Sequence, residues 1–150
     1  MDRDRFSLLH PLRVRWNECD PHGVVFNANY FMYYDVAMYE WQRAVGYSHG
    51  EKPDFLTVHA ECDFKGSAHF DQELEIAARC ASIGTKSMDL ECAIFRGEEL
   101  LNQGKLTYVY IESASRRAVP IPAHFVERVV AFERLRPVIA ARPVGMAGQR

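Results

Sequence analysis

Alternating hydrophobic and polar residues make up much of the chain. Five stretches show this period of two: 8–16, 56–64, 73–80, 88–94 and 100–111. Such alternation is typical of a strand that buries one face and exposes the other. We therefore predict one strand near the N-terminus and four antiparallel strands further along, with a hairpin turn at 96–99 between the last two.

One long segment has a different pattern, because apolar and aromatic side chains surround it on nearly all sides. It begins at Asn27 or Asn29, either of which could cap a helix, and runs to about Val45. Gly46 follows where a helix would end. The few charged residues of this segment cannot cover a whole face, so we expect a helix that is buried on most sides.

The order of these elements predicts an α+β fold in which one curved antiparallel sheet wraps around one long buried helix. Pro120-Ile121-Pro122 should end the sheet, and residues 123–134 are predicted to form a short second helix. We place a single domain at residues 1–136. Residues 137–150 contain several prolines and glycines and are expected to form a flexible C-terminal tail.

Composition and charge exclude several classes of protein. The 150 residues include 48% hydrophobic and 25% charged residues, the balance of an ordinary globular domain rather than a disordered chain. The formal net charge of −2 gives no general reason to bind nucleic acid or an anionic membrane. We find neither an apolar run that could span a membrane nor a secretion signal. The four cysteines lack a CxxC spacing, so we expect free thiols in a cytoplasmic protein.

The densest polar cluster lies between the first strand and the long helix. It consists of Asn17, Glu18, Asp20, His22 and Asn27. A helix N-terminus offers unpaired main-chain N–H groups that can stabilise an oxyanion, and a nearby carboxylate could act as nucleophile or general base. Asp20 precedes a proline and could equally be a simple turn residue. His22 fits an ordinary loop histidine better than a catalytic one, and Glu18 is expected to be exposed.

Lys86 lies in a second polar segment, Ile83-Gly84-Thr85-Lys86-Ser87, which joins two predicted strands. An ordinary turn with a solvated lysine explains this segment. The functional alternative is a phosphate site that Lys86 shares with Arg116 and Arg117. The chain has no glycine-rich phosphate loop, no GxSxG elbow and no HExxH helix, and its polar loop lacks the ligand spacing of a zinc site.

The segment from Val14 to Tyr30 resembles the signature of the 4-hydroxybenzoyl-CoA thioesterase family of the hotdog fold. Its sequence is VRWNECDPHGVVFNANY. The shared features are an aspartate, a turn with glycine, two aliphatic residues and an aromatic one, and then Asn-Tyr at the start of the helix. The resemblance extends over residues 8 to about 130. It implies a hotdog fold, in which the long helix lies within a curved antiparallel sheet.

The resemblance further implies hydrolysis of an aromatic or short-to-medium acyl-CoA. No cofactor or metal is implied, because coenzyme A is part of the substrate. Asp20 falls on the family's catalytic aspartate, and Asn27 falls where a main-chain N–H acts as oxyanion donor. The positions expected to bind substrate are His22, Gly23, Val24, Tyr30 and Lys86. The family also implies a homo-oligomer, either a dimer or a tetramer of dimers, with its active site at the dimer interface.

Two departures from the family pattern leave alternatives open. Pro21-His22 replaces small residues that are common in relatives, and Asn27 stands where some bacterial relatives have a histidine. One alternative is a hotdog hydratase or dehydratase, but the position five residues after Asp20, where a hydratase needs histidine, is Val25. The other is a non-catalytic acyl-CoA-binding or scaffold protein, because fold alone does not fix function.

Overall fold

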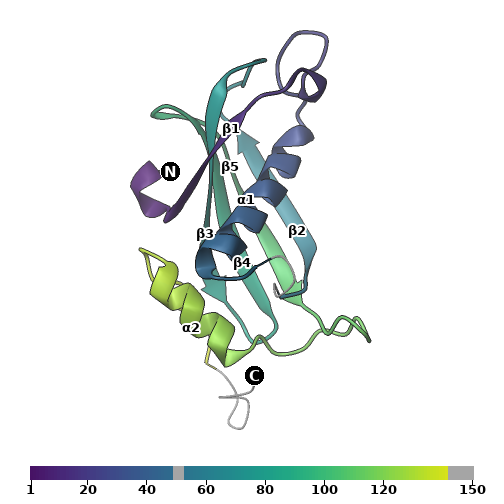
Figure 1. The fold of residues 1–150 in the computed structure, drawn as a ribbon, viewed down its shortest axis with the longest axis vertical. Helices are drawn as coiled ribbons and strands as arrows, with labels where there is room; N and C mark the ends of the chain where they lie inside the picture. The colour runs from purple at the N-terminus through teal and green to yellow at the C-terminus, as the bar shows by residue number, and fades with distance from the viewer. Residues whose placement is uncertain (49–52, 142–150) are drawn as a thin grey trace.

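The computed structural model describes residues 1–48 and 53–141 (Figure 1). The strands are β1 (Leu8–Arg13), β2 (Phe55–Phe64), β3 (Glu73–Ile83), β4 (Ser87–Arg96), β5 (Glu99–Tyr110) and β6 (Val138–Ile139). The helices are α1 (Asn29–Val45) and α2 (Ala123–Phe132), with short 3₁₀ turns η1 (Arg3–Arg5) and η2 (Trp16–Glu18). Neither α-helix has the length and apolar character needed to cross a membrane.

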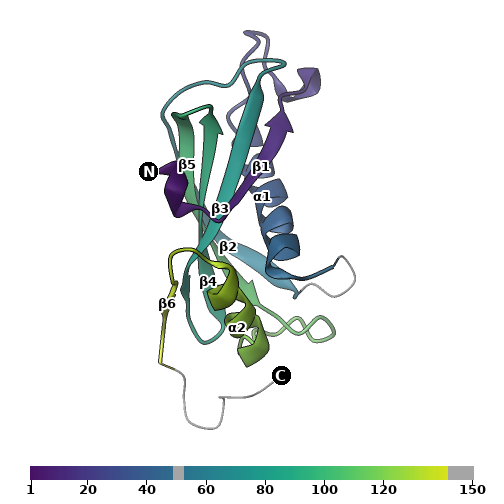
Figure 2. The same ribbon diagram turned by 60° about the vertical axis from the view of Figure 1, so that its left-hand side comes forward.

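The strands form one sheet in the order β1-β3-β4-β5-β2, and β6 adds to β3. All pairs are antiparallel except β3 with β6. Figures 1 and 2 both show α1 lying across one face of this curved sheet. The predicted α+β hotdog architecture, with one sheet around one long helix, is confirmed.

Helix α1 supplies the largest side chains of the core between helix and sheet. Tyr34 and Trp41 are fully buried, and Tyr33 is only 1% exposed. The helix ends at Gly46, as predicted, with a φ of 117° that glycine adopts without strain. The predicted asparagine cap is wrong, because the cap position is Ala28 and carries no side-chain cap hydrogen bond.

Both ends of the chain differ in detail from the prediction. Strand β1 ends at Arg13 rather than Trp16, because the chain turns into η2 and leaves the Trp16 side chain exposed. Near the C-terminus, Val138 and Ile139 pair with Ser82 and Ile83 of β3, so the start of the predicted tail extends the sheet. Residues 142–150 lie outside the described residues, and the domain boundary at residue 136 stays a prediction.

Strand β2 forms one edge of the sheet and is open to solvent on both faces. Only Phe55 and Cys62 of this strand are partly covered, and Val58 and Phe64 are 60% and 55% exposed. A long exposed edge strand offers unpaired main-chain groups to another chain. The described chain thus leaves an unusual amount of sheet surface uncovered on this side.

Candidate active site

Asp20 lies in a tight turn between η2 and α1. Gly23 N donates to the main-chain oxygen of Asp20, and Asp20 N donates to the oxygen of Val24, both at 2.9 Å. The Asp20 carboxylate itself accepts from His22 N at 2.8 Å through Oδ1. Gly23 has a φ of 78°, which favours glycine at this position. The Asp-Pro-His-Gly sequence therefore fixes one carboxylate oxygen and leaves the side chain partly exposed.

The turn is held against residues 68–70, which lead into β3. Val24 pairs with His69, and Phe70 N donates to Gly23 O at 3.1 Å. Tyr30 supports the same segment, because its hydroxyl accepts the N–H of Ala68 at 3.1 Å. Tyr30 is 3% exposed, so in a single chain it is a core residue that supports the site through its hydrogen bond with Ala68. The structure thus brings Asp20, His22, Gly23, Val24 and Tyr30 together.

The main-chain N–H groups of Asn27 and Ala28 have no hydrogen-bond acceptor within the described part of the chain. The next N–H groups are occupied, since Asn29 N donates to Phe26 O at 2.8 Å and Phe31 N donates to Ala28 O at 3.2 Å. These two free donors stand at the positive end of the α1 dipole. They offer a position where negative charge on an oxygen would be stabilised.

Glu18 is buried, so the expectation of an exposed side chain is wrong. It is 3% exposed, and its carboxylate accepts from Arg15 N at 2.7 Å, from the Arg15 guanidinium, and from the Tyr33 hydroxyl at 3.0 Å. Burial first, and then the nearby Glu18 carboxylate, raise the pKa of Tyr33, which keeps this hydroxyl protonated as a donor. The only sequence signal was Arg15 three residues before Glu18.

Cys19 is a second nucleophilic group beside Asp20. Burial, followed by the carboxylates of Glu18 and Asp20, raises the pKa of the Cys19 thiol. Because the thiolate is the reactive form, the thiol is not activated at neutral pH. Within residues 1–48 and 53–141, no group of three or more His, Cys, Asp or Glu side chains is placed to hold a metal ion.

The chain does not bring Lys86 close to Asp20. The Asp20 turn is held at the beginning of β3, whereas Lys86 lies in the turn after its end. The 11 residues of β3 separate these ends by roughly 33 Å. Figures 1 and 2 show the loop before α1 and the turn between β3 and β4 at opposite ends of the sheet. Arg116 and Arg117 follow β5 and lie near the Lys86 end.

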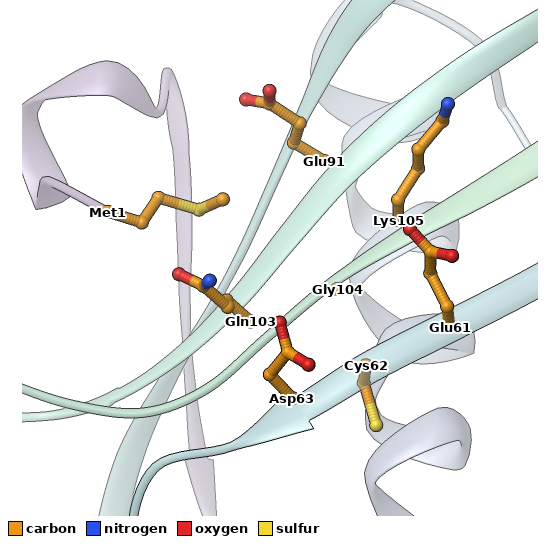
Figure 3. A pocket seen from close by; sticks show the side chains of 8 residues that line it. All are labelled: Met1, Glu61, Cys62, Asp63, Glu91, Gln103, Gly104 and Lys105. Carbon is orange, nitrogen blue, oxygen red and sulfur yellow. The ribbon is translucent and has the colours of Figure 1, made fainter.

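A cavity of about 360 Å³ opens on the sheet face opposite α1 (Figure 3). Its lining is Met1, Glu61, Cys62, Asp63, Glu91, Gln103, Gly104 and Lys105. Burial opposes ionisation of Glu91, but hydrogen bonds from Arg5 and Arg79 hold its pKa below the ordinary value. Glu91 is therefore an ion-paired structural carboxylate. The cavity does not include Asp20.

The sequence profile of the thioesterase superfamily matches residues 22–102, more than half of the chain. The chain belongs to the thioesterase superfamily. The prediction of a thioester hydrolase is thereby confirmed at the level of the family. The matched segment begins just after Asp20, so the role of that carboxylate stays a prediction.

Individual proteins are similar to this chain in sequence or in fold. The acyl-CoA thioester hydrolase YbgC of Escherichia coli O157:H7 is 26% identical over 121 residues, which cover 77% of this chain and 90% of that protein. Among solved structures, the PA5185 protein of Pseudomonas aeruginosa has a TM-score of 0.78 at 26% identity, covering 88% of this chain and 95% of that one. A Thermus thermophilus thioesterase, complexed with coenzyme A and Zn, has a TM-score of 0.81 at 24% identity, covering 90% and 99%.

Proposed function

We propose that this protein hydrolyses acyl-CoA thioesters and that Asp20 is its central catalytic group. The observation that carries this proposal is the Asp20 carboxylate, held in a fixed turn shortly before the free N–H groups at the start of α1. Membership of the thioesterase superfamily supports the reaction class. The name of the Escherichia coli relative, an acyl-CoA thioester hydrolase, supports the substrate class.

The residues near the turn supply the parts that such a reaction needs. The N–H groups of Asn27 and Ala28 are the proposed donors to the thioester oxygen, which gains negative charge as the carbonyl is attacked. Asp20 either attacks the carbonyl carbon, giving an anhydride that water then cleaves, or removes a proton from an attacking water. Both routes consume one water and release a free acid and coenzyme A.

The acyl group that we propose is aromatic or a short-to-medium chain. Apolar surface lies next to the Asp20 turn, where the rings of Trp16 and Phe70 meet edge to face with 5.2 Å between their centroids. These side chains are 70% and 47% exposed. They offer hydrophobic contact to a bound acyl group without fixing its length.

We also propose that the active protein is a homo-oligomer built on the exposed edge of β2. Antiparallel pairing of β2 with β2 of a second copy reverses the direction of one sheet relative to the other. The end of the sheet that carries Lys86, Arg116 and Arg117 would then lie beside the Asp20 end of the partner. In this arrangement Lys86 could bind the phosphates of a coenzyme A whose thioester lies at Asp20 of the partner subunit. In a single chain the two residues are too far apart for this.

The experiment that tests the proposed reaction is chromatographic measurement of coenzyme A released from a panel of acyl-CoAs. The panel spans benzoyl, hydroxybenzoyl, phenylacetyl and straight-chain groups, with enoyl-CoA included to detect hydration. We expect release of free coenzyme A from at least one aromatic or short-to-medium member. Hydration of enoyl-CoA without release would instead favour a hydratase, and saturable binding without turnover would favour a binding protein.

A further inference from the structure

Glu18 is a buried charged residue at the end of the short turn η2, whereas glutamate side chains are ordinarily exposed. Its side chain is 4% exposed, although Arg15, its one cationic partner among the described residues, keeps 71% of its own side chain exposed. A buried carboxylate is costly unless donors satisfy it. Arg15, just before η2, and Tyr33, in the second turn of α1, provide these donors.

The main chain of the same residue forms a second connection to the start of α1. The carbonyl oxygen of Glu18 accepts from Phe26 N at 3.0 Å and from the Asn29 side-chain amide at 2.8 Å. Glu18 therefore bonds to the chain on both sides of Asn27 and Ala28, whose N–H groups are free. Asp20 follows Glu18 by two residues, with Cys19 paired to Val25 between them.

We propose that Glu18 is a positioning residue for Asp20, because its carboxylate fixes the spacing between the Asp20 side chain and the N–H groups of Asn27 and Ala28. The proposal rests on the proposed function. A carboxylate and an oxyanion donor act on the same thioester only when their separation is held closely, since small displacements reduce the rate strongly. Glu18 acts through this geometry and does not itself touch the substrate.

The chain contains a matched comparison at a distance from the Asp20 turn. Glu133, after α2, is 7% exposed and accepts from Trp41 Nε1 and from Cys80 N, both at 2.7 Å. It joins α2 to α1 and β3 much as Glu18 joins the turn to α1. Glu133→Gln is therefore the control for the general effect of replacing a buried, hydrogen-bonded carboxylate.

The test compares Glu18→Gln, Tyr33→Phe and Glu133→Gln, using an acyl-CoA that the wild type hydrolyses. We expect Glu18→Gln to lower kcat roughly 10- to 100-fold with little change in KM. Tyr33→Phe, which removes a single hydroxyl and should fold normally, is expected to lower kcat by a smaller factor in the same direction. Glu133→Gln should leave both kinetic constants within about twofold of the wild type, whatever its effect on thermal stability.

The decisive comparison adds Glu18→Gln to Asp20→Asn. If Glu18 acts by positioning Asp20, the double variant should have the same residual rate as Asp20→Asn alone. A further loss in the double variant, or wild-type kcat in both Glu18→Gln and Tyr33→Phe, would overturn the positioning role and leave the proposed reaction standing. An inactive wild type would overturn both proposals.

Discussion

Asp20 and Glu18, two acidic residues near the turn, differ in burial and in the number of donors around the carboxylate. Asp20 is partly exposed and has one donor on Oδ1, whereas Glu18 is buried among several donors. Local sequence could single out Asp20, because its turn residues and its family signature are adjacent to it. It could not show that Glu18 is buried, because the Tyr33 hydroxyl that helps to bury it lies 15 residues further along the chain, on α1.

Glu133 should make the stability of the protein depend on pH. Burial raises the pKa of its carboxyl, despite hydrogen bonds from Cys80 and Trp41. The folded state thus holds this proton more tightly than the unfolded chain does. Its contribution to stability is complete below the ordinary pKa of 4.5 and is lost as pH rises through the raised value.

We therefore expect Glu133→Gln to gain stability relative to the wild type as pH rises from about 4.5 to 7.5. Urea unfolding at several pH values measures the difference in the free energy of unfolding. A difference that is the same at both ends of this range would contradict the raised pKa.

At the scale of elements, periodicity predicted the fold well and the boundaries less well. Alternation located strands β1 to β5, and Gly46 marked the end of α1. Helix α1 begins at Asn29, one of the two predicted positions, but the predicted asparagine cap is wrong, because the Asn29 side-chain amide donates to Glu18 O instead. Strand β6, with only two residues, has too short a pattern to be recognised from sequence.

Packing of α1 on the sheet depends on a glycine in β5. A Cβ built on Gly104 would lie 2.6 Å from Glu61 O and 2.6 Å from Cε2 of Tyr34, closer than such atoms can approach. Gly104→Ala should therefore destabilise the protein by about 1–3 kcal/mol, because strand or helix must shift. The measurement is the free energy of unfolding in urea.

Gly84→Ala is a suitable control for this packing. The nearest atom to its built Cβ is the Ser87 hydroxyl at 3.3 Å, and this small side chain can move. We expect a clearly smaller loss than at Gly104. Equal effects at the two positions would mean that contact between α1 and β5 is looser than the structure indicates.

At the scale of the whole molecule, β2 is where the sequence pattern and the single chain disagree. Alternation predicted a strand with one buried face, yet most of β2 is exposed on both faces. The alternating pattern of β2 fits a strand with one face buried. In an oligomer, a second copy of the chain can bury that face. This is also why the sequence could not place Lys86 relative to Asp20.

Two exposed valines allow the proposed interface to be tested. Val58 in β2 is 60% exposed, and Val138 in β6 is 74% exposed at another edge of the sheet. We expect Val58→Asp to shift the protein toward monomers in analytical ultracentrifugation and to lower thioesterase activity, since a charged side chain on an edge strand disfavours its pairing with a second strand. Val138→Asp should retain the wild-type assembly. Identical sedimentation of both variants and the wild type would exclude β2 as the interface.

Single-turnover hydrolysis of an acyl-CoA substrate by Asp20→Asn measures whether Asp20 carries the chemistry. Asparagine keeps the size and the turn hydrogen bond but removes the charge. His22→Ala, in the same turn, serves as the control. We predict a rate reduced roughly 1,000-fold or more in Asp20→Asn, with coenzyme A binding retained, and a much smaller effect in His22→Ala. Equal losses in the two variants, or an unchanged rate in Asp20→Asn, would mean that Asp20 is not the central catalytic group.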